Sequence, residues 1–143
     1  MNINAILVSV DGSASSLHAL AFAIQAMQRR DDVTLHVLTV QAPIISGGVK
    51  RFISAEVIAD YYQDEGRQAL QAAKTMLDES GVAYQEHIEV GPVAETIHRF
   101  AKDHECGLIV MGTRGLGSVA GLLMGSVATK VLSLSDIPVT LVK

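Results

Sequence analysis

Residues 108–132 read LIVMGTRGLGSVAGLLMGSVATKVL and contain the clearest structural pattern in the sequence. The opening LIVM is a short apolar run, which is typical of a buried strand. Residues 126–134 are expected to form a helix that stops before Asp136 and Pro138. Glycines separate the two segments, so the stretch predicts a strand, a glycine-rich connection and a helix in succession.

The same succession continues along the rest of the chain. Further strands are expected at residues 5–10, 34–40, 82–90 and 139–142. Further helices are expected after Ser13 or Ser15, at 54–80 with Gly81 as the C-terminal cap, and from Pro92 onward. This alternation predicts an α/β fold, a single open, doubly wound, Rossmann-like domain over residues 1–143. We expect about five parallel strands in the order 3-2-1-4-5, with about four helices on both faces.

The middle of the chain contains weaker elements. Gly66 lies inside the predicted helix 54–80, where glycine is less favourable than alanine by roughly 1 kcal/mol. Residues 82–90 alternate only partly between apolar and polar side chains, so this strand is expected at an edge of the sheet. Pro43 and the glycines at 47 and 48 predict a mobile connection before the long helix.

Composition and charge restrict the class of function. The chain has 143 residues, of which 49% are hydrophobic and only 4% are aromatic. This composition favours a core of small aliphatic side chains. A net charge of -4 provides no attraction to nucleic acid or to an anionic membrane. The sequence shows no basic leader region and no run near the ~20 apolar residues of a membrane span, so we expect a cytoplasmic protein without membrane insertion. The single cysteine, Cys106, is expected to be a buried small hydrophobe.

Two turns are candidates for a ligand site, because ligands of open α/β sheets bind beyond the carboxyl ends of strands. One turn begins at Asp11 after the first strand, and the other begins at Gly112 after the fourth. Glycines allow a backbone to approach a phosphate and to adopt positive φ, and a helix N-terminus offers unpaired N–H groups. Ser126 adds a hydroxyl donor and Arg114 adds a charged fork. The alternative is that the glycines only shape a turn and a flexible loop.

The spacing of the glycines favours the phosphate site. Gly112-x-x-Gly115 is followed after nine residues by Gly125-Ser126. This pattern resembles the ATP-binding branch of the universal stress protein family, and the resemblance extends over the whole chain. It implies contact between adenine and the backbone near Val40. The full set of nucleotide-binding residues that it implies is Val10, Asp11, Val40, Met111, Gly112, Gly115, Gly125, Ser126 and Val127. Ser13 and Arg114 are added because they adjoin these residues in the sequence.

The resemblance implies a small cytoplasmic regulatory module of the stress response that binds ATP with Mg²⁺, and it assigns no metal ligands. An alternative is an enzyme that uses the same crevice for slow ATP hydrolysis or adenylate transfer. Neither turn contains an obvious general base or water-positioning glutamine, so binding without fast turnover is favoured. The intact glycine pattern argues against a third possibility, an interaction module with an empty site. A homodimer is expected through the apolar edge of the last strand, at Val139, Thr140, Leu141 and Val142.

Other motifs fit the expected topology less well. Residues 115–120 satisfy a loose GxGxxG/A dinucleotide pattern with Asp136 as the acid, but such a fingerprint follows the first strand. Lys130 lies inside a helix and outside any GxxxxGK[ST] loop. Tyr61 and Tyr62 are expected to pack in the core or on a partner. The five histidines lack metal-ligand spacing and are expected on the surface or on helix faces.

Overall fold

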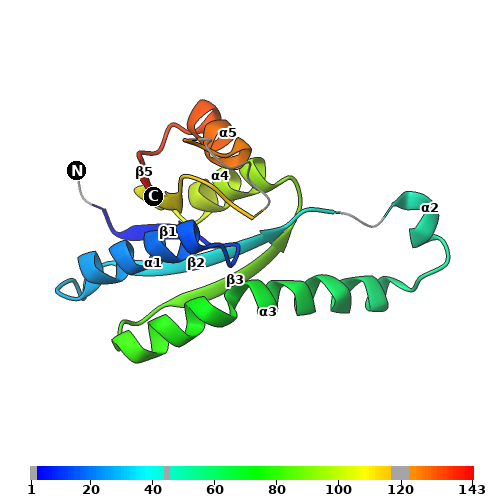
Figure 1. Cartoon of the computed structure of the whole chain (residues 1–143), viewed down its shortest axis with the longest axis horizontal. Coiled ribbons are helices and arrows are strands. Elements are labelled where there is room, and N and C mark those ends of the chain that lie inside the picture. Colours follow the sequence, from blue (N-terminus) through cyan, green and yellow to red (C-terminus); the bar gives the residue numbers. More distant parts are fainter. Residues whose placement is uncertain (1–2, 44–45, 117–122) are drawn as a thin grey trace.

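The computed structural model describes residues 3–43, 46–116 and 123–143. Its strands form one parallel sheet in the predicted order β3-β2-β1-β4-β5 (Figure 1). The strands are β1 (Ala5–Ser9), β2 (Thr34–Gln41), β3 (Gln85–Val90), β4 (Leu108–Gly112) and β5 (Val139–Val142). The helices are α1 (Ala14–Met27), α2 (Gly47–Lys50), α3 (Ala55–Ser80), α4 (Val93–Asp103) and α5 (Ser126–Leu134). The predicted fold class and strand order are confirmed.

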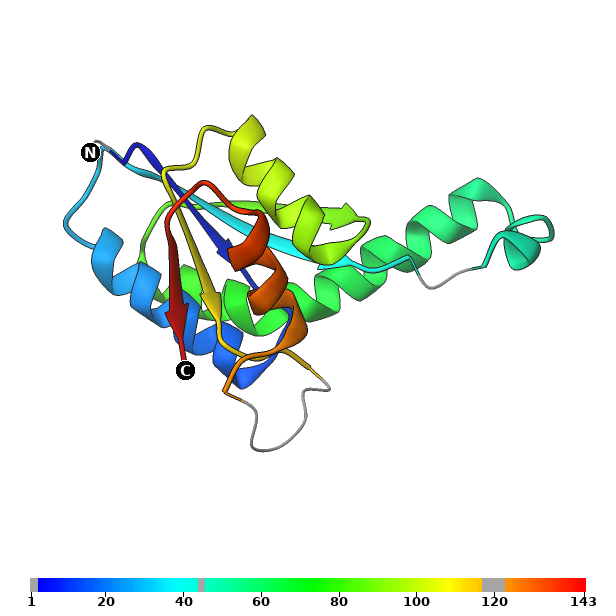
Figure 2. The same ribbon diagram turned by 90° about the horizontal axis from the view of Figure 1, so that it is seen from above.

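Helices cover both faces of the sheet, and each face has its own core (Figure 2). Val8 and Val37 belong to the cluster under α1 and α3, whereas Leu7 and Leu38 belong to the cluster under α4 and α5. Successive residues of a strand point to opposite faces of the sheet, so the central strands β1 and β2 are buried on both faces. Cys106 is buried in the second cluster, and burial raises the pKa of its thiol to about 11, as suits a small hydrophobe.

The long helix α3 has the boundaries that its sequence predicts. The Oγ of Ser54 accepts a hydrogen bond from the N–H of Val57 at 3.2 Å, and Gly81 ends the helix with φ of 74°. Gly66 in the helix interior has a packing role, because a Cβ built there would lie 2.4 Å from Cγ2 of Ile88. The missing side chain lets α3 approach β3 closely, which accounts for a glycine at an unfavourable helical position.

Some boundaries differ from the expected ones. The connection before α3 contains the short helix α2, whose cap is Ser46; its Oγ accepts a hydrogen bond from the N–H of Val49 at 3.3 Å. A serine cap satisfies a free N–H group even in so short a helix. Pro92 is the N-cap of α4 rather than a residue of its first turn, and β3 begins at Gln85 rather than at 82. The predicted edge position of β3 is confirmed.

The helix α2 and the first turns of α3 project away from the sheet (Figure 1). Phe52, between these helices, is 90% exposed, and Val57 is also exposed. Tyr62 is buried, as expected for a core residue, and its ring contacts that of Tyr61 with centroids 5.3 Å apart. Within the described part of the chain, no helix combines the length and the apolar character that crossing a membrane requires.

Candidate functional site

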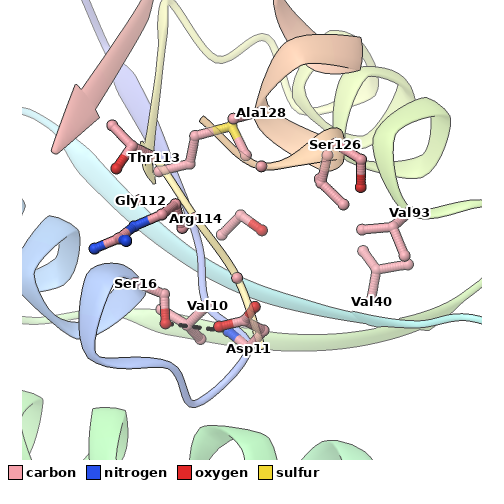
Figure 3. A pocket seen from close by; sticks show the side chains of 15 residues that line it. Val10, Asp11, Ser16, Val40, Val93, Gly112, Thr113, Arg114, Ser126 and Ala128 are labelled. Carbon is pink, nitrogen blue, oxygen red and sulfur yellow. Dashed lines mark hydrogen bonds between the residues drawn. The ribbon is translucent and has the colours of Figure 1, made fainter. Parts of the chain in front are cut away.

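A cavity of about 300 Å³ lies at the carboxyl ends of β1 and β4, which are neighbours in the sheet (Figure 3). The turn after β1 and the glycine-rich segment after β4 therefore face the same space, as the strand order requires. All predicted site residues except Ser13 line it: Val10, Asp11, Val40, Met111, Gly112, Arg114, Gly115, Gly125, Ser126 and Val127. The lining also includes residues that the sequence pattern does not single out: Ser9, Ser16, Val93, Thr113 and Ala128.

Helix α5 begins at the cavity with an open N-terminus. Its N-cap is Gly125, a residue that has no side chain to make a capping hydrogen bond. The first N–H groups of a helix have no acceptor within the helix, and the helix dipole makes this end partially positive. The N–H of Gly125 donates to the carbonyl of Thr113 at 2.6 Å, which fixes this end beside the strand β4. This end of the cavity therefore carries a partial positive charge, which favours anions.

Crowding, rather than positive φ, accounts for two of the glycines that line the cavity, Gly112 and Gly115. Gly12 has φ of 86°, whereas Gly125 has φ of -80° and Gly115 has no positive φ. A Cβ at Gly115 would lie 2.5 Å from Oδ2 of Asp11, and a Cβ at Gly112 would meet the backbone of α1. The expectation of positive φ in the glycine-rich segment is therefore wrong at 115 and 125. The backbone of α1 leaves no room for a side chain at 112, and the side chain of Asp11 occupies the space beside 115.

Asp11 connects the two turns that form the cavity. Its Oδ1 accepts a hydrogen bond from the N–H of Ser13 at 2.9 Å, and its Oδ2 accepts one from the N–H of Leu116 at 3.1 Å. Its own N–H donates to Oγ of Ser16 at 3.3 Å (Figure 3). Asp11 is the only carboxylate among the lining residues that the structure describes, and Arg114 is the only cation there.

Ser13 does not line the cavity. Its Oγ accepts a hydrogen bond from the N–H of Ser16 at 3.2 Å and caps α1, which settles the choice between Ser13 and Ser15 as the cap. Ser13 therefore contributes indirectly, by fixing the start of the helix from which Ser16 reaches the cavity. Arg114, the other residue chosen for its place in the sequence, does line the cavity.

Apolar side chains form one end of the cavity. Figure 3 shows Val40, near the end of β2, and Val93, the first residue of α4, together in this region. Both are partly buried against the core cluster under α4 and α5. The sequence prediction missed Val93 because this residue belongs neither to the two turns nor to the residues that the family resemblance implies. The relevant signal is its place directly after β3, at the same carboxyl edge of the sheet.

Two other motifs have structural explanations. Residues 117–120 of the loose dinucleotide pattern lie outside the described residues, but its proposed acid, Asp136, is described. Lys102 at 2.8 Å and His98 at 3.3 Å hold its carboxylate and lower its pKa to about 2. Lys130 forms an ion pair with Glu95 of α4. Neither Asp136 nor Lys130 lines the cavity.

The prediction that all histidines lie on the surface or on helix faces is wrong for His36. His36 is only 6% exposed, because its strand position points toward α4 from the interior of the sheet. Its Nδ1 lies 3.0 Å from Nε2 of His87, and its ring also contacts Phe100 and His104. Burial lowers the pKa values of His36 and His87. The described residues contain no group of three or more histidine, cysteine or acidic side chains able to hold a metal ion.

Comparison with known proteins gives a consistent result. Residues 2–143 match the universal stress protein family. Universal stress protein MJ0531 of Methanocaldococcus jannaschii is 34% identical over 96% of this chain and 81% of its own length. Universal stress protein YxiE of Bacillus subtilis is 33% identical over 98% and 99%.

Two solved structures are also similar over nearly their whole length. A universal stress protein in complex with cAMP has a TM-score of 0.74 and 27% identity, covering 100% of this chain and 99% of that chain. The universal stress protein of Archaeoglobus fulgidus in complex with dAMP has a TM-score of 0.69 and 25% identity, covering 99% and 98%. With the family match over residues 2–143 and relatives above 30% identity, the chain belongs to the universal stress protein family.

Proposed function

We propose that the chain binds ATP in the cavity between β1 and β4 and acts as a small cytoplasmic regulatory module of the stress response. The observation that carries this proposal is the uncapped N-terminus of α5, which opens into a cavity of about 300 Å³. An uncapped helix N-terminus favours anions, and the cavity volume lies in the range of small-molecule sites.

The chemistry of the two ends of the cavity supports an adenine nucleotide. The valines at 10, 40 and 93 offer an apolar surface for a planar base, and the backbone at 126–127 offers N–H groups for phosphates. The similar structures with cAMP and dAMP contain ligands with an adenine ring and a phosphate. Arg114 adds a cation for further phosphates, which favours ATP over AMP. Because Asp11 is the only carboxylate among the described lining residues, Mg²⁺ is expected to enter with the phosphates.

Hydrolysis in this cavity is expected to be slow. Phosphoryl transfer to water requires a group that orients the attacking water. The carboxylate of Asp11 already accepts hydrogen bonds from two backbone N–H groups, those of Ser13 and Leu116. Backbone donors at α5 contact phosphates in the ground state as well as in the transition state, and such uniform binding does not raise the rate. We therefore place turnover well below the median enzyme value of about 10 per second.

We also propose a homodimer through the edge of β5. The two edges of the sheet differ: β3 carries Glu86 and Glu89, whereas β5 has only apolar side chains and Thr140. Charged side chains discourage edge pairing, so β5 is the edge that a second copy can extend.

Calorimetric titration with ATP and Mg²⁺ tests the binding proposal, with ADP, AMP and cAMP as comparison ligands. ATP is expected to bind with the highest affinity of the four, because Arg114 and α5 add contacts to its outer phosphates. Absence of heat and of a thermal shift at millimolar ATP contradicts nucleotide binding. Single-turnover assays with labelled ATP test the rate, and hydrolysis at several per second that Asp11→Asn abolishes would assign catalysis to this residue.

A further inference from the structure

The carbonyl of Val142 at the end of β5 connects the last strand to the glycine-rich segment. It accepts a hydrogen bond from the N–H of Thr113 at 2.9 Å and a second from the hydroxyl of Ser15 at 3.1 Å. Ser15 lies in the first turn of α1, far from Val142 in the sequence. One acceptor thus binds both the start of α1 and the residue that follows β4.

The same hydroxyl also reaches the next residue of the glycine-rich segment. The N–H of Arg114 donates to Oγ of Ser15 with a length of 3.4 Å. Ser15 therefore donates to β5 and accepts from Arg114, whereas Thr113 donates to β5 and accepts from Gly125 at 2.6 Å. Through these bonds, both sides of the cavity entrance, at 113–114 and at 125, depend on the position of Val142.

Close packing reinforces this connection. A Cβ built at Gly112 would lie 2.5 Å from Oγ of Ser15 and 2.7 Å from its carbonyl carbon. The first turn of α1 is therefore pressed against the residue at which β4 ends. Ser15 itself is not among the residues that line the cavity.

We propose that Ser15 is a positioning residue for phosphate binding. Its hydroxyl accepts from the N–H of Arg114 and, through the carbonyl of Val142, fixes the position of Thr113, and both of these residues line the cavity. This inference rests on the proposed nucleotide binding and adds a residue that acts without touching the nucleotide. Its effect is confined to the phosphate end, because the base end is formed by Val40 and Val93 on other elements.

The test compares Ser15→Ala with the wild-type protein for two ligands, ATP and adenosine. Loss of one or two hydrogen bonds predicts ATP binding weaker by roughly three- to tenfold, with the affinity for adenosine unchanged. Alanine is a strong helix former, so α1 is expected to persist in the variant. Calorimetry measures ATP binding, NMR titration measures adenosine binding, and circular dichroism checks the fold.

Ser80→Ala is the matched control. Its hydroxyl also donates to a carbonyl, that of Leu77 at 2.6 Å, and accepts from an N–H, that of Val82 at 3.1 Å. It lies at the end of α3, away from the cavity, so the ratio of ATP to adenosine affinity is expected to stay at the wild-type value.

The outcomes separate this inference from the proposed function. A selective loss of ATP affinity in Ser15→Ala, absent from Ser80→Ala, supports the positioning role. Unchanged ATP affinity, or an equal loss for ATP and adenosine, overturns it while leaving nucleotide binding intact. A wild-type protein that binds neither ligand overturns the proposed function and this inference together.

Discussion

In the half of the sheet formed by β1, β4 and β5, glycines border a cavity, whereas in the half formed by β2 and β3 a glycine closes a contact. Gly112 and Gly115 leave room between the end of β4, α1 and Asp11. Gly66 instead brings α3 directly onto Ile88 of β3. The comparison shows that the same residue type borders a cavity in one half and allows close packing in the other, depending on its neighbours.

Gly115→Val tests the half that contains the cavity. Its Cβ would lie 2.5 Å from Oδ2 of Asp11, so the carboxylate and the glycine-rich segment must shift. We expect ATP affinity to fall at least about tenfold, which is ~1.4 kcal/mol, with a small change in unfolding free energy. Calorimetry and urea unfolding measure the two quantities.

Gly47→Val is the matched control for this variant. A Cβ at Gly47 meets nothing within 4 Å, and the residue lies in the projecting helix α2. Wild-type ATP affinity is expected here. If Gly115→Val also binds ATP as the wild type does, the glycine-rich segment is not the binding site.

Leu141→Pro tests whether β5 provides the dimer interface. In this parallel strand the carbonyls of Pro138 and Val142 accept from β4, so the backbone groups of Val139 and Leu141 face the open edge. Proline at 141 removes an outward N–H without breaking the ladder to β4. We expect monomers by light scattering, whereas Thr140→Pro would instead damage the sheet within each copy.

Leu141→Ala is the control, because it shortens the same side chain and keeps the N–H group. It is expected to remain a dimer. A dimer that survives Leu141→Pro with its fold intact by circular dichroism would place the interface elsewhere.

Gly66→Ala tests the half in which a glycine closes a packing contact. At an unhindered helix position this change stabilises a protein by roughly 1 kcal/mol. Here the new Cβ would lie 2.4 Å from Ile88, and overpacking destabilises by about 1–3 kcal/mol. We expect the free energy of unfolding to fall, with ATP affinity unchanged; combining the change with Ile88→Ala is expected to make the effect of alanine at 66 less unfavourable. A Gly66→Ala variant with a higher free energy of unfolding than the wild type would show that Ile88 can move aside at little cost.

The histidines of β2 and β3 predict a smaller, pH-dependent effect in the same half. Burial and neighbouring histidines lower the pKa of His36 below its usual 6.5, and burial and His104 lower that of His87, against the opposing charges of Glu86 and Glu89. The unfolded chain then binds protons before the folded one, so stability is complete above about pH 6.5 and falls as the pH decreases below it.

His36→Leu is expected to reduce this decrease. Urea unfolding of both proteins at about pH 7.5 and about pH 5.5 measures the difference, since protonation of an unfolded histidine begins near 6.5. ATP affinity measured at about pH 7.5 is expected to be the same for both proteins, since neither His36 nor the rings that it contacts line the cavity. An equal loss of stability on acidification in both proteins would mean that groups other than His36 cause the pH dependence.

Much of the fold could be predicted because its signals are local. The parallel sheet with helices on both faces followed from the alternation of elements, and its strand order from the doubly wound fold type. The ends of α3 followed from the capping residues Ser54 and Gly81. The burial of His36 depends on a helix that packs from elsewhere in the sequence. The short helix α2 was missed because its glycines indicate a turn and its four residues contain little helical periodicity.

In the candidate site, too, residues with a local sequence signal could be predicted and residues without one could not. The glycine spacing identified Gly112, Gly115 and Gly125, which lie close together in the sequence. Val93 was missed because it reaches the cavity only through the order of the strands. Ser13 was assigned to the site by proximity in the sequence, but its hydroxyl is used to begin α1. Proximity along the chain does not show which way a side chain points at the start of a helix.

The contact between Gly66 and Ile88 also limits how this sequence can diverge. A larger residue at 66 collides with the isoleucine, and a smaller residue at 88 alone leaves a void beneath the glycine. Each single step therefore lowers stability until the second step compensates, and the two effects are not additive. Sequences that evolve from this one are therefore expected to change positions 66 and 88 together or to keep both. The exposed face of α3 has no such constraint and can vary.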